Sequence, residues 1–79
     1  MNFILLKNYK KEMGIFINFS SSTIFDNELN VSFDDLIVNY KELLDKNKKY
    51  YLFCNGGIQS RKAYNTLKYK GYDVVLVLK

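Results

Sequence analysis

The sequence contains no proline, no histidine and no tryptophan, and its only cysteine is Cys54. A single cysteine excludes a disulfide within the chain, and without histidine no Cys/His zinc site can form. No apolar stretch is long enough to span a membrane, and the N-terminal residues lack the cleavage site of a signal peptide. These absences favour a protein of the reducing cytoplasm that carries no metal or cofactor and does not bind a membrane.

The length and the apolar content together indicate one small packed domain. The chain has 79 residues, of which 48% are hydrophobic and 16% are aromatic. This composition is too apolar for a disordered chain. A domain of this size buries only about 60% of its unfolded surface, so we expect a modest core and a single domain over residues 1–79.

The basic residues are concentrated in the second half of the chain. The 12 basic and 8 acidic residues give a net charge of +4, and no acidic residue occurs between positions 46 and 72. The basic residues of this stretch are Lys46, Lys48, Lys49, Arg61, Lys62, Lys68 and Lys70. They indicate either a solvated surface or a field that attracts small anions or an acidic partner. We expect no nucleic-acid partner, because no nucleic-acid-binding motif is present.

Apolar runs and helical patterns alternate along the chain and predict an α/β fold. Continuous apolar runs at 15–19, 50–53 and 74–78 predict strands of a parallel sheet covered on both faces by helices, and 29–31 is a very short extended candidate. The segment before residue 15 is compatible with a strand at 3–6 or a short helix around 7–13. We therefore expect a small parallel β-sheet flanked by helices.

Two helices are predicted between these strands. Ser32 is a candidate N-cap, with Asp34 and Asp35 in the first turn. One apolar face then follows helical spacing, formed by Phe33, Leu36, Ile37, Tyr40, Leu43 and Leu44. A second helix is predicted at 61–70, beginning at Ser60 and ending at Gly71, with Ala63, Tyr64 and Leu67 facing inward.

The stretch "YLFCNGGIQSRKA" places Cys54 directly after a predicted strand and before a predicted helix. Ligands of α/β domains usually bind at the carboxyl ends of the strands. Asn55, Gly56 and Gly57 can turn several backbone N–H groups toward one centre, and the following helix N-terminus favours an anion at the same place. This combination predicts a stabilised thiolate. An inert buried cysteine and an ordinary glycine turn are the alternatives.

At these residues the chain resembles the rhodanese-like domains, a sulfurtransferase family. The family's active loop follows an apolar strand and has Cys, two variable residues, Gly, two variable residues and Ser, and here these places hold Cys54, Gly57 and Ser60. The continuation through Lys70, Gly71, Tyr72 and a valine-rich strand is similar to the family, as are "IFINF" and "ELNVSFDDL" upstream. The resemblance covers roughly residues 14–78.

The chain departs from the family pattern at several places. Asn18 and Phe19 stand where the family usually has an acid and a basic residue, the loop after them has no histidine, and Gln59 replaces a residue that is often basic. The glycine pair and final helix that commonly follow the last strand do not appear before residue 79, so we expect a trimmed domain or a fragment.

The resemblance implies a two-step sulfur transfer from a small anionic donor such as thiosulfate to a thiol or protein acceptor. Cys54 would form a persulfide. The loop of Asn55, Gly56, Gly57, Ile58, Gln59 and Ser60 would hold its charge through backbone N–H groups, and Arg61 would attract the donor.

Two other functions stay open at this point. One is a catalytically silent rhodanese-like module for protein interaction or thiol sensing. The other is a cysteine phosphatase, which the spacing disfavours: these enzymes have five residues between Cys and Arg, whereas Arg61 comes one place later. The oligomeric state does not follow from the sequence.

Overall fold

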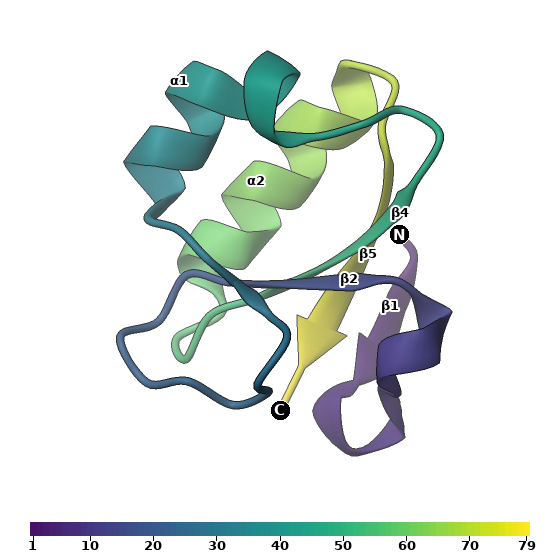
Figure 1. The fold of residues 1–79 in the computed structure, drawn as a ribbon, viewed down its shortest axis with the longest axis vertical. Helices are drawn as coiled ribbons and strands as arrows, with labels where there is room; N and C mark the ends of the chain where they lie inside the picture. Colours follow the sequence, from purple (N-terminus) through teal and green to yellow (C-terminus); the bar gives the residue numbers. More distant parts are fainter.

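The computed structural model describes residues 1–79 as a five-stranded sheet with two α-helices (Figure 1). The strands are β1 (Phe3–Leu5), β2 (Ile15–Asn18), β3 (Leu29–Asn30), β4 (Lys49–Phe53) and β5 (Asp73–Leu78). The helices are α1 (Phe33–Leu43) and α2 (Ile58–Tyr69), with short 3-10 helices η1 (Leu6–Asn8) and η2 (Lys11–Met13) near the N-terminus. The predicted α/β fold with a parallel sheet is confirmed.

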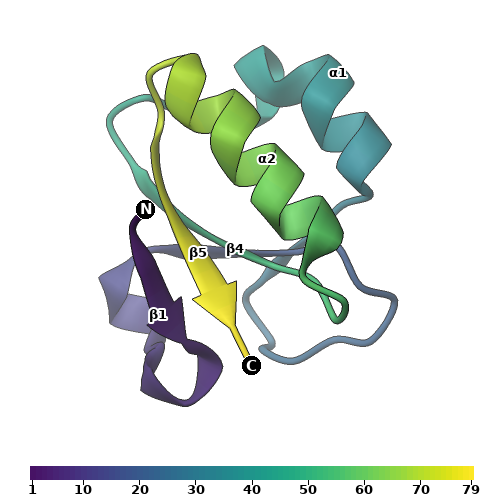
Figure 2. The same cartoon turned by 180° about the vertical axis from the view of Figure 1, so that it is seen from behind.

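All four strand pairs are parallel, and the strand order is β1-β5-β4-β2-β3. Strand β4 lies between β2 and β5, and its residues Tyr50, Tyr51, Leu52 and Phe53 are buried. A strand with side chains buried on both faces needs a continuous apolar run, which explains the pattern seen in the sequence. Strand β1 completes one edge beside β5 (Figure 2).

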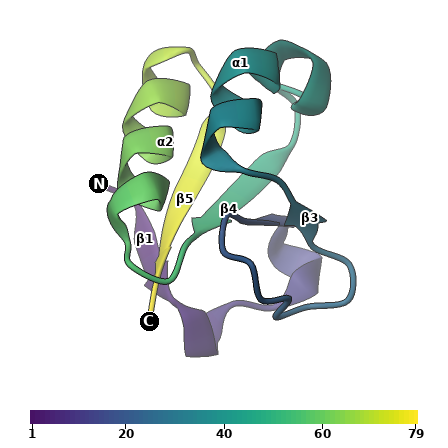
Figure 3. The same cartoon turned by 90° about the vertical axis from the view of Figure 1, so that its left-hand side faces the viewer.

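Both α-helices cover the same face of the sheet and lie side by side (Figure 3). Leu36 of α1 and Leu67 of α2 are fully buried in one core together with Leu52 of β4. The expectation that helices would cover both faces was therefore wrong for the α-helices. A second core, on the alternate side chains of β4 and β5, forms against the N-terminal segment and the β2–β3 loop.

Aromatic packing closes this second face of the sheet. Tyr9, between η1 and η2, has its ring centroid 4.9 Å from that of Phe16 and 5.1 Å from those of Phe25 and Tyr51. The Tyr9 hydroxyl donates a hydrogen bond to the Gly14 carbonyl at 2.6 Å. Tilted aromatic rings at these separations attract one another. The short segment around Tyr9 therefore covers the face of the sheet on which no α-helix packs. Burial, the main cause, raises the pKa of Tyr9 above its ordinary value.

The N-terminal segment contains parts of both structures that the sequence left open. Residues 3–5 form strand β1, and residues 6–8 and 11–13 form the 3-10 turns. A 3-10 turn lets the chain change direction within three residues. The segment can therefore add an edge strand and then cross to the aromatic face.

The start of α1 agrees with the sequence prediction, but one residue near its end, Leu43, does not face the core as predicted. The Asp35 backbone N–H donates to Ser32 Oγ at 3.1 Å, which is the expected N-cap. Leu36 and Leu44 are buried, but Leu43 is 41% exposed. The backbone of Asn39, inside α1, is non-helical with φ of −113° and ψ of 18°, so the residues after it no longer keep the helical spacing of the first turns against the core.

Helix α2 begins at Ile58, earlier than the start predicted from Ser60 and Arg61. Its N-cap is Gly57, whose φ of 78° lies in the left-handed region that glycine adopts without steric cost. The turn that starts the helix is therefore completed before Ser60. Ala63, Tyr64 and Leu67 are buried as predicted, and Gly71, with φ of 93°, follows the helix end.

Gly14 tests how tightly β2 packs on β4. A Cβ at this position would lie 2.7 Å from the Lys49 carbonyl oxygen and 2.8 Å from the Tyr51 ring. Gly14→Ala should therefore lower the free energy of unfolding by about 1 to 3 kcal/mol through overpacking. In a domain of this size each kcal/mol lowers Tm by roughly 4 to 8 °C, measurable by circular dichroism.

Gly56→Ala is the matched control for this substitution. A Cβ there meets no atom within 4 Å, so the free energy of unfolding should stay within about 0.5 kcal/mol of wild type. Equal Tm values for Gly14→Ala and wild type would contradict the close approach of β2 and β4.

Candidate functional site

Strand β4 carries the chain to Cys54, the first residue beyond its carboxyl end. The β4–α2 loop lies at the same end of the molecule as the end of β5 (Figure 1). Cys54 is a free, buried cysteine with 7% of its surface exposed. This placement follows from the parallel sheet, because all its strands end at one edge.

Backbone N–H groups at the start of α2 point at the cysteine sulfur. The Gly57 N–H donates to Cys54 Sγ at 3.1 Å and the Ser60 N–H at 3.3 Å. The Cys54 thiol donates to Ser60 Oγ at 3.4 Å, and the Ser60 hydroxyl donates to the Gly57 carbonyl at 3.3 Å. When the thiol is ionised, this hydroxyl can turn and donate to the sulfur instead. Because Gly57 has a positive φ, the chain turns back within three residues and brings these donors together.

The electrostatics of this loop favour the thiolate. Burial would raise the pKa of Cys54, but hydrogen bonds to the sulfur from the Ser60 side chain and from the backbone of Ser60, Gly57 and Gln59 lower it. The net result is a pKa below the ordinary thiol value. The N-terminus of α2 adds the positive end of the helix dipole at the same place.

A small hollow of about 200 Å³ opens beside the sulfur. Residues of the loop and of the β5 end line it: Cys54, Asn55, Gly56, Gly57, Arg61, Val77, Leu78 and Lys79. The structure thus brings five of the eight sequence-predicted site residues to the hollow. Ser60 is buried beneath the loop, whereas Ile58 and Gln59 are exposed and do not line the hollow.

The contribution of β5 was not found from the sequence. Val77 and Leu78 end strand β5 and Lys79 follows it, and these residues reach the site because β5 pairs with β4 in parallel. The rule that ligands bind at the carboxyl ends of neighbouring parallel strands could have pointed to these residues. Applying this rule requires the strand order, which the sequence pattern does not give.

Asn18, the last residue of β2 and one of the positions that differ from the family pattern, holds the loop that follows it. Asn18 is fully buried, and its side-chain amide donates to the Ser22 carbonyl at 2.8 Å and to Glu28 Oε2 at 2.9 Å. Glu28 Oε1 accepts the backbone N–H groups of Ile24 and Phe25, each at 2.9 Å. The pair therefore holds the 19–28 loop in place beside the site through hydrogen bonds.

A match to a protein-family model assigns the chain to a family. The family model described as the rhodanese-like domain matches residues 16–79. The chain belongs to the rhodanese-like domain family. No curated protein gives a significant sequence match to it.

Solved structures share the fold of this rhodanese-like chain. A protein from Staphylococcus saprophyticus superposes with a TM-score of 0.84 and 17% identity, over 99% of this chain and 87% of that chain. A rhodanese-related protein from Thermoplasma volcanium gives a TM-score of 0.78 and 20% identity, over 99% and 84%. An NAD-dependent persulfide reductase from A. fulgidus gives 0.75 and 20%, over 99% of this chain but 15% of that chain.

No three residues among the aspartates, glutamates and Cys54 are grouped so that they could hold a metal ion. Neither helix of this rhodanese-like domain has the length and apolar character required to cross a bilayer.

The Ser60 hydroxyl can be tested for its effect on the thiol. The rate of Cys54 alkylation by iodoacetamide should follow the thiolate fraction and reach half its maximum at a pH below the ordinary thiol pKa. Ser60→Ala removes one hydrogen bond that favours the charged form, so this midpoint should move to higher pH.

Ser32→Ala is the control for this measurement, because it removes a serine that contacts a helix N-terminus but not the sulfur. Its midpoint should equal that of wild type. A Ser60→Ala midpoint at the wild-type pH would show that the hydroxyl does not stabilise the thiolate.

Proposed function

We propose that this protein is a sulfurtransferase that carries a sulfur atom as a persulfide on Cys54. The observation that carries the proposal is the pair of backbone donors, Gly57 N–H and Ser60 N–H, at 3.1 and 3.3 Å from Sγ. Fixed donors around a sulfur stabilise a nucleophilic thiolate and the anion formed on it without an acid-base side chain. Membership of the rhodanese-like family supports the same chemistry.

The first step loads the cysteine. The Cys54 thiolate attacks the outer sulfur of thiosulfate, the new S–S bond forms, and the bond to the inner sulfur breaks. Sulfite leaves with the electron pair of that bond. The negative charge that remains on the terminal sulfur of the persulfide faces the donors of residues 55–60.

The second step unloads the sulfur. A thiolate of a small molecule or of an acceptor protein attacks the terminal sulfur, and the S–S bond of the persulfide breaks. The electron pair of that bond returns to Cys54 as a thiolate. No oxidant or reductant is consumed in either step, so neither a metal nor a cofactor is needed for the transfer. A reducing compartment such as the cytoplasm would keep the resting thiol available.

The lining of the hollow fits a small anion. Arg61 and Lys79 bring positive charge to it, and Asn55 brings an amide that can donate hydrogen bonds. Ile58, the first residue of α2, is 67% exposed and adds an apolar contact for an acceptor that approaches from solvent. Phosphatase chemistry is less compatible with this loop, since six residues separate Cys54 from Arg61 where the phosphatase loop has five.

Intact-mass measurement tests the persulfide directly. Purified protein incubated with thiosulfate should gain the mass of one sulfur atom, and subsequent cyanide or a thiol should remove it. Cys54→Ser should gain nothing under the same conditions. An unchanged wild-type mass, in a protein with a folded circular dichroism spectrum, would instead identify an interaction or thiol-sensing module.

The role of Arg61 can be measured from the kinetics with thiosulfate. Arg61→Ala should raise the KM for thiosulfate about fivefold, because loss of one exposed charged contact costs about 1 kcal/mol. The kcat should change little.

Lys62→Ala is the matched control, since Lys62 is also exposed at the start of α2 but does not line the hollow. It should leave KM unchanged. Equal KM values for wild type and Arg61→Ala would remove Arg61 from the donor site.

A further inference from the structure

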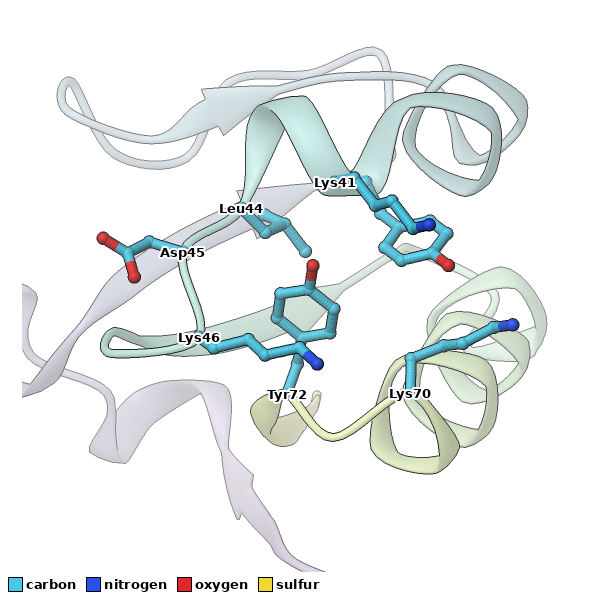
Figure 4. Close-up of a pocket in the computed structure, with 7 residues that line it drawn as sticks. Lys41, Leu44, Asp45, Lys46, Lys70 and Tyr72 are labelled. Atoms are coloured by element: carbon cyan, nitrogen blue, oxygen red, sulfur yellow. The ribbon is translucent and has the colours of Figure 1, made fainter.

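The largest hollow of the molecule, about 680 Å³, lies at the opposite end of the sheet from Cys54. It forms where α1 and α2 end and where the chain enters β4 and β5 (Figure 4). Its lining residues are Tyr40, Lys41, Leu44, Asp45, Lys46, Lys70 and Tyr72. The volume is within the range of about 300 to 1,000 Å³ that is typical of ligand sites.

The charge of this hollow is predominantly positive. Lys41, Lys46 and Lys70 come from three separate segments, the last turn of α1, the α1–β4 loop and the end of α2. The carboxylate of Asp45 points away from the other lining side chains (Figure 4). It accepts the Asn47 backbone N–H at 2.8 Å, so it shapes the turn and does not project into the hollow.

The carboxyl end of α2 is capped by backbone hydrogen bonds and does not require a lysine side chain. The Tyr72 N–H donates to the Leu67 carbonyl at 3.0 Å, and the Gly71 N–H donates to the Lys68 carbonyl at 3.1 Å. This pair of bonds is a Schellman motif, which satisfies the last carbonyls of α2 from the backbone. The Lys70 ammonium is therefore not needed as a cap of α2 and is available to a ligand.

The floor of the hollow is aromatic but its rings are already packed. Tyr40 and Tyr72 meet edge to face, with centroids 5.7 Å apart and an interplanar angle of 89°. The Lys46 ammonium lies 5.4 Å from the Tyr72 ring centroid, and Tyr72 is only 5% exposed. The buried Tyr72 ring therefore offers no free face on which a nucleic-acid base could stack.

From these observations we propose that the hollow is a docking site for an acidic segment of a partner protein. Three ammonium groups spread around a wide, open hollow match several carboxylates along a peptide better than one small anion, which would contact only part of the set. The basic stretch without acidic residues between positions 46 and 72 supplies two of the three lysines. A partner docked here leaves the Cys54 hollow free.

A fluorescein-labelled peptide of six glutamates around a central tyrosine is the probe, measured by fluorescence anisotropy at low and high salt. We expect saturable binding that weakens with salt. In ¹⁵N-labelled protein, the shifted backbone resonances should belong to residues 40–46 and 70–72. Shifts centred on residues 54–61, or no binding at millimolar peptide, would overturn the proposal.

Charge reversal supplies the matched comparison. Lys46→Glu with Lys70→Glu should weaken peptide binding at least tenfold, whereas Lys10→Glu with Lys11→Glu, the same change in net charge on the N-terminal segment, should weaken it less than twofold. Equal losses in both double variants would overturn the proposal by showing a net-charge effect. Lys70→Ala alone keeps the Lys46 contact with Tyr72 and should still weaken binding severalfold in a folded protein.

Two other anionic ligands test whether the hollow prefers an acidic peptide. Inorganic phosphate should compete only weakly, and a single-stranded oligonucleotide should bind less tightly than the peptide. Stronger binding of either one at residues 40–46 and 70–72 would overturn the acidic-segment assignment. Persulfide formation on Cys54 should be the same in wild type and in the double variant, so this test and the test of sulfur transfer fail independently.

Discussion

The contact between Cys54 Sγ and the first turn of α2 is the constraint on which the site depends. Two backbone N–H groups and one hydroxyl lie 3.1 to 3.4 Å from the sulfur. They converge because Gly57 adopts a φ of 78° and caps α2, which begins at the next residue. The same hydrogen bonds offset the burial of the thiol, which by itself would favour the neutral form and an inert cysteine. Strand, glycine and helix therefore act together, and none of them alone would make a reactive sulfur.

The two ends of the sheet carry different hollows. At the carboxyl end the strands bring Cys54 beside the end of β5, and the Asn18–Glu28 pair holds the neighbouring loop. At the other end α1 and α2 stop, and their turns carry lysines around a larger hollow. The basic stretch of the sequence is divided between these ends, because Arg61 lies in the first turn of α2 and Lys70 follows its last residue. The proposed persulfide site and the proposed docking site therefore lie at opposite ends of the same sheet.

The sequence predicted the fold class because buried parallel strands leave continuous apolar runs, as in residues 50–53, and because Ser32 and Gly71 mark helix ends by ordinary capping chemistry. It placed Cys54 at a strand end for the same reason. It missed the true start of α2, since Gly57 has no side chain that signals an N-cap and Ile58 is exposed. It also missed the aromatic cluster around Tyr9 that covers the second face of the sheet, because Tyr9 lies in a segment without periodicity. The residues at the end of β5 that line the Cys54 hollow were missed because pairing between distant strands leaves no local pattern.

The central claim is that backbone donors hold a charged sulfur species on Cys54. A high-resolution crystal structure of the protein soaked with thiosulfate measures this most directly. The account predicts density for one additional sulfur bonded to Cys54, located in the hollow beside Arg61 and within hydrogen-bond distance of N–H groups of residues 55–60. A terminal sulfur turned toward the apolar core, or a soaked crystal in which the thiol stays unmodified while its N–H neighbours point elsewhere, would contradict it.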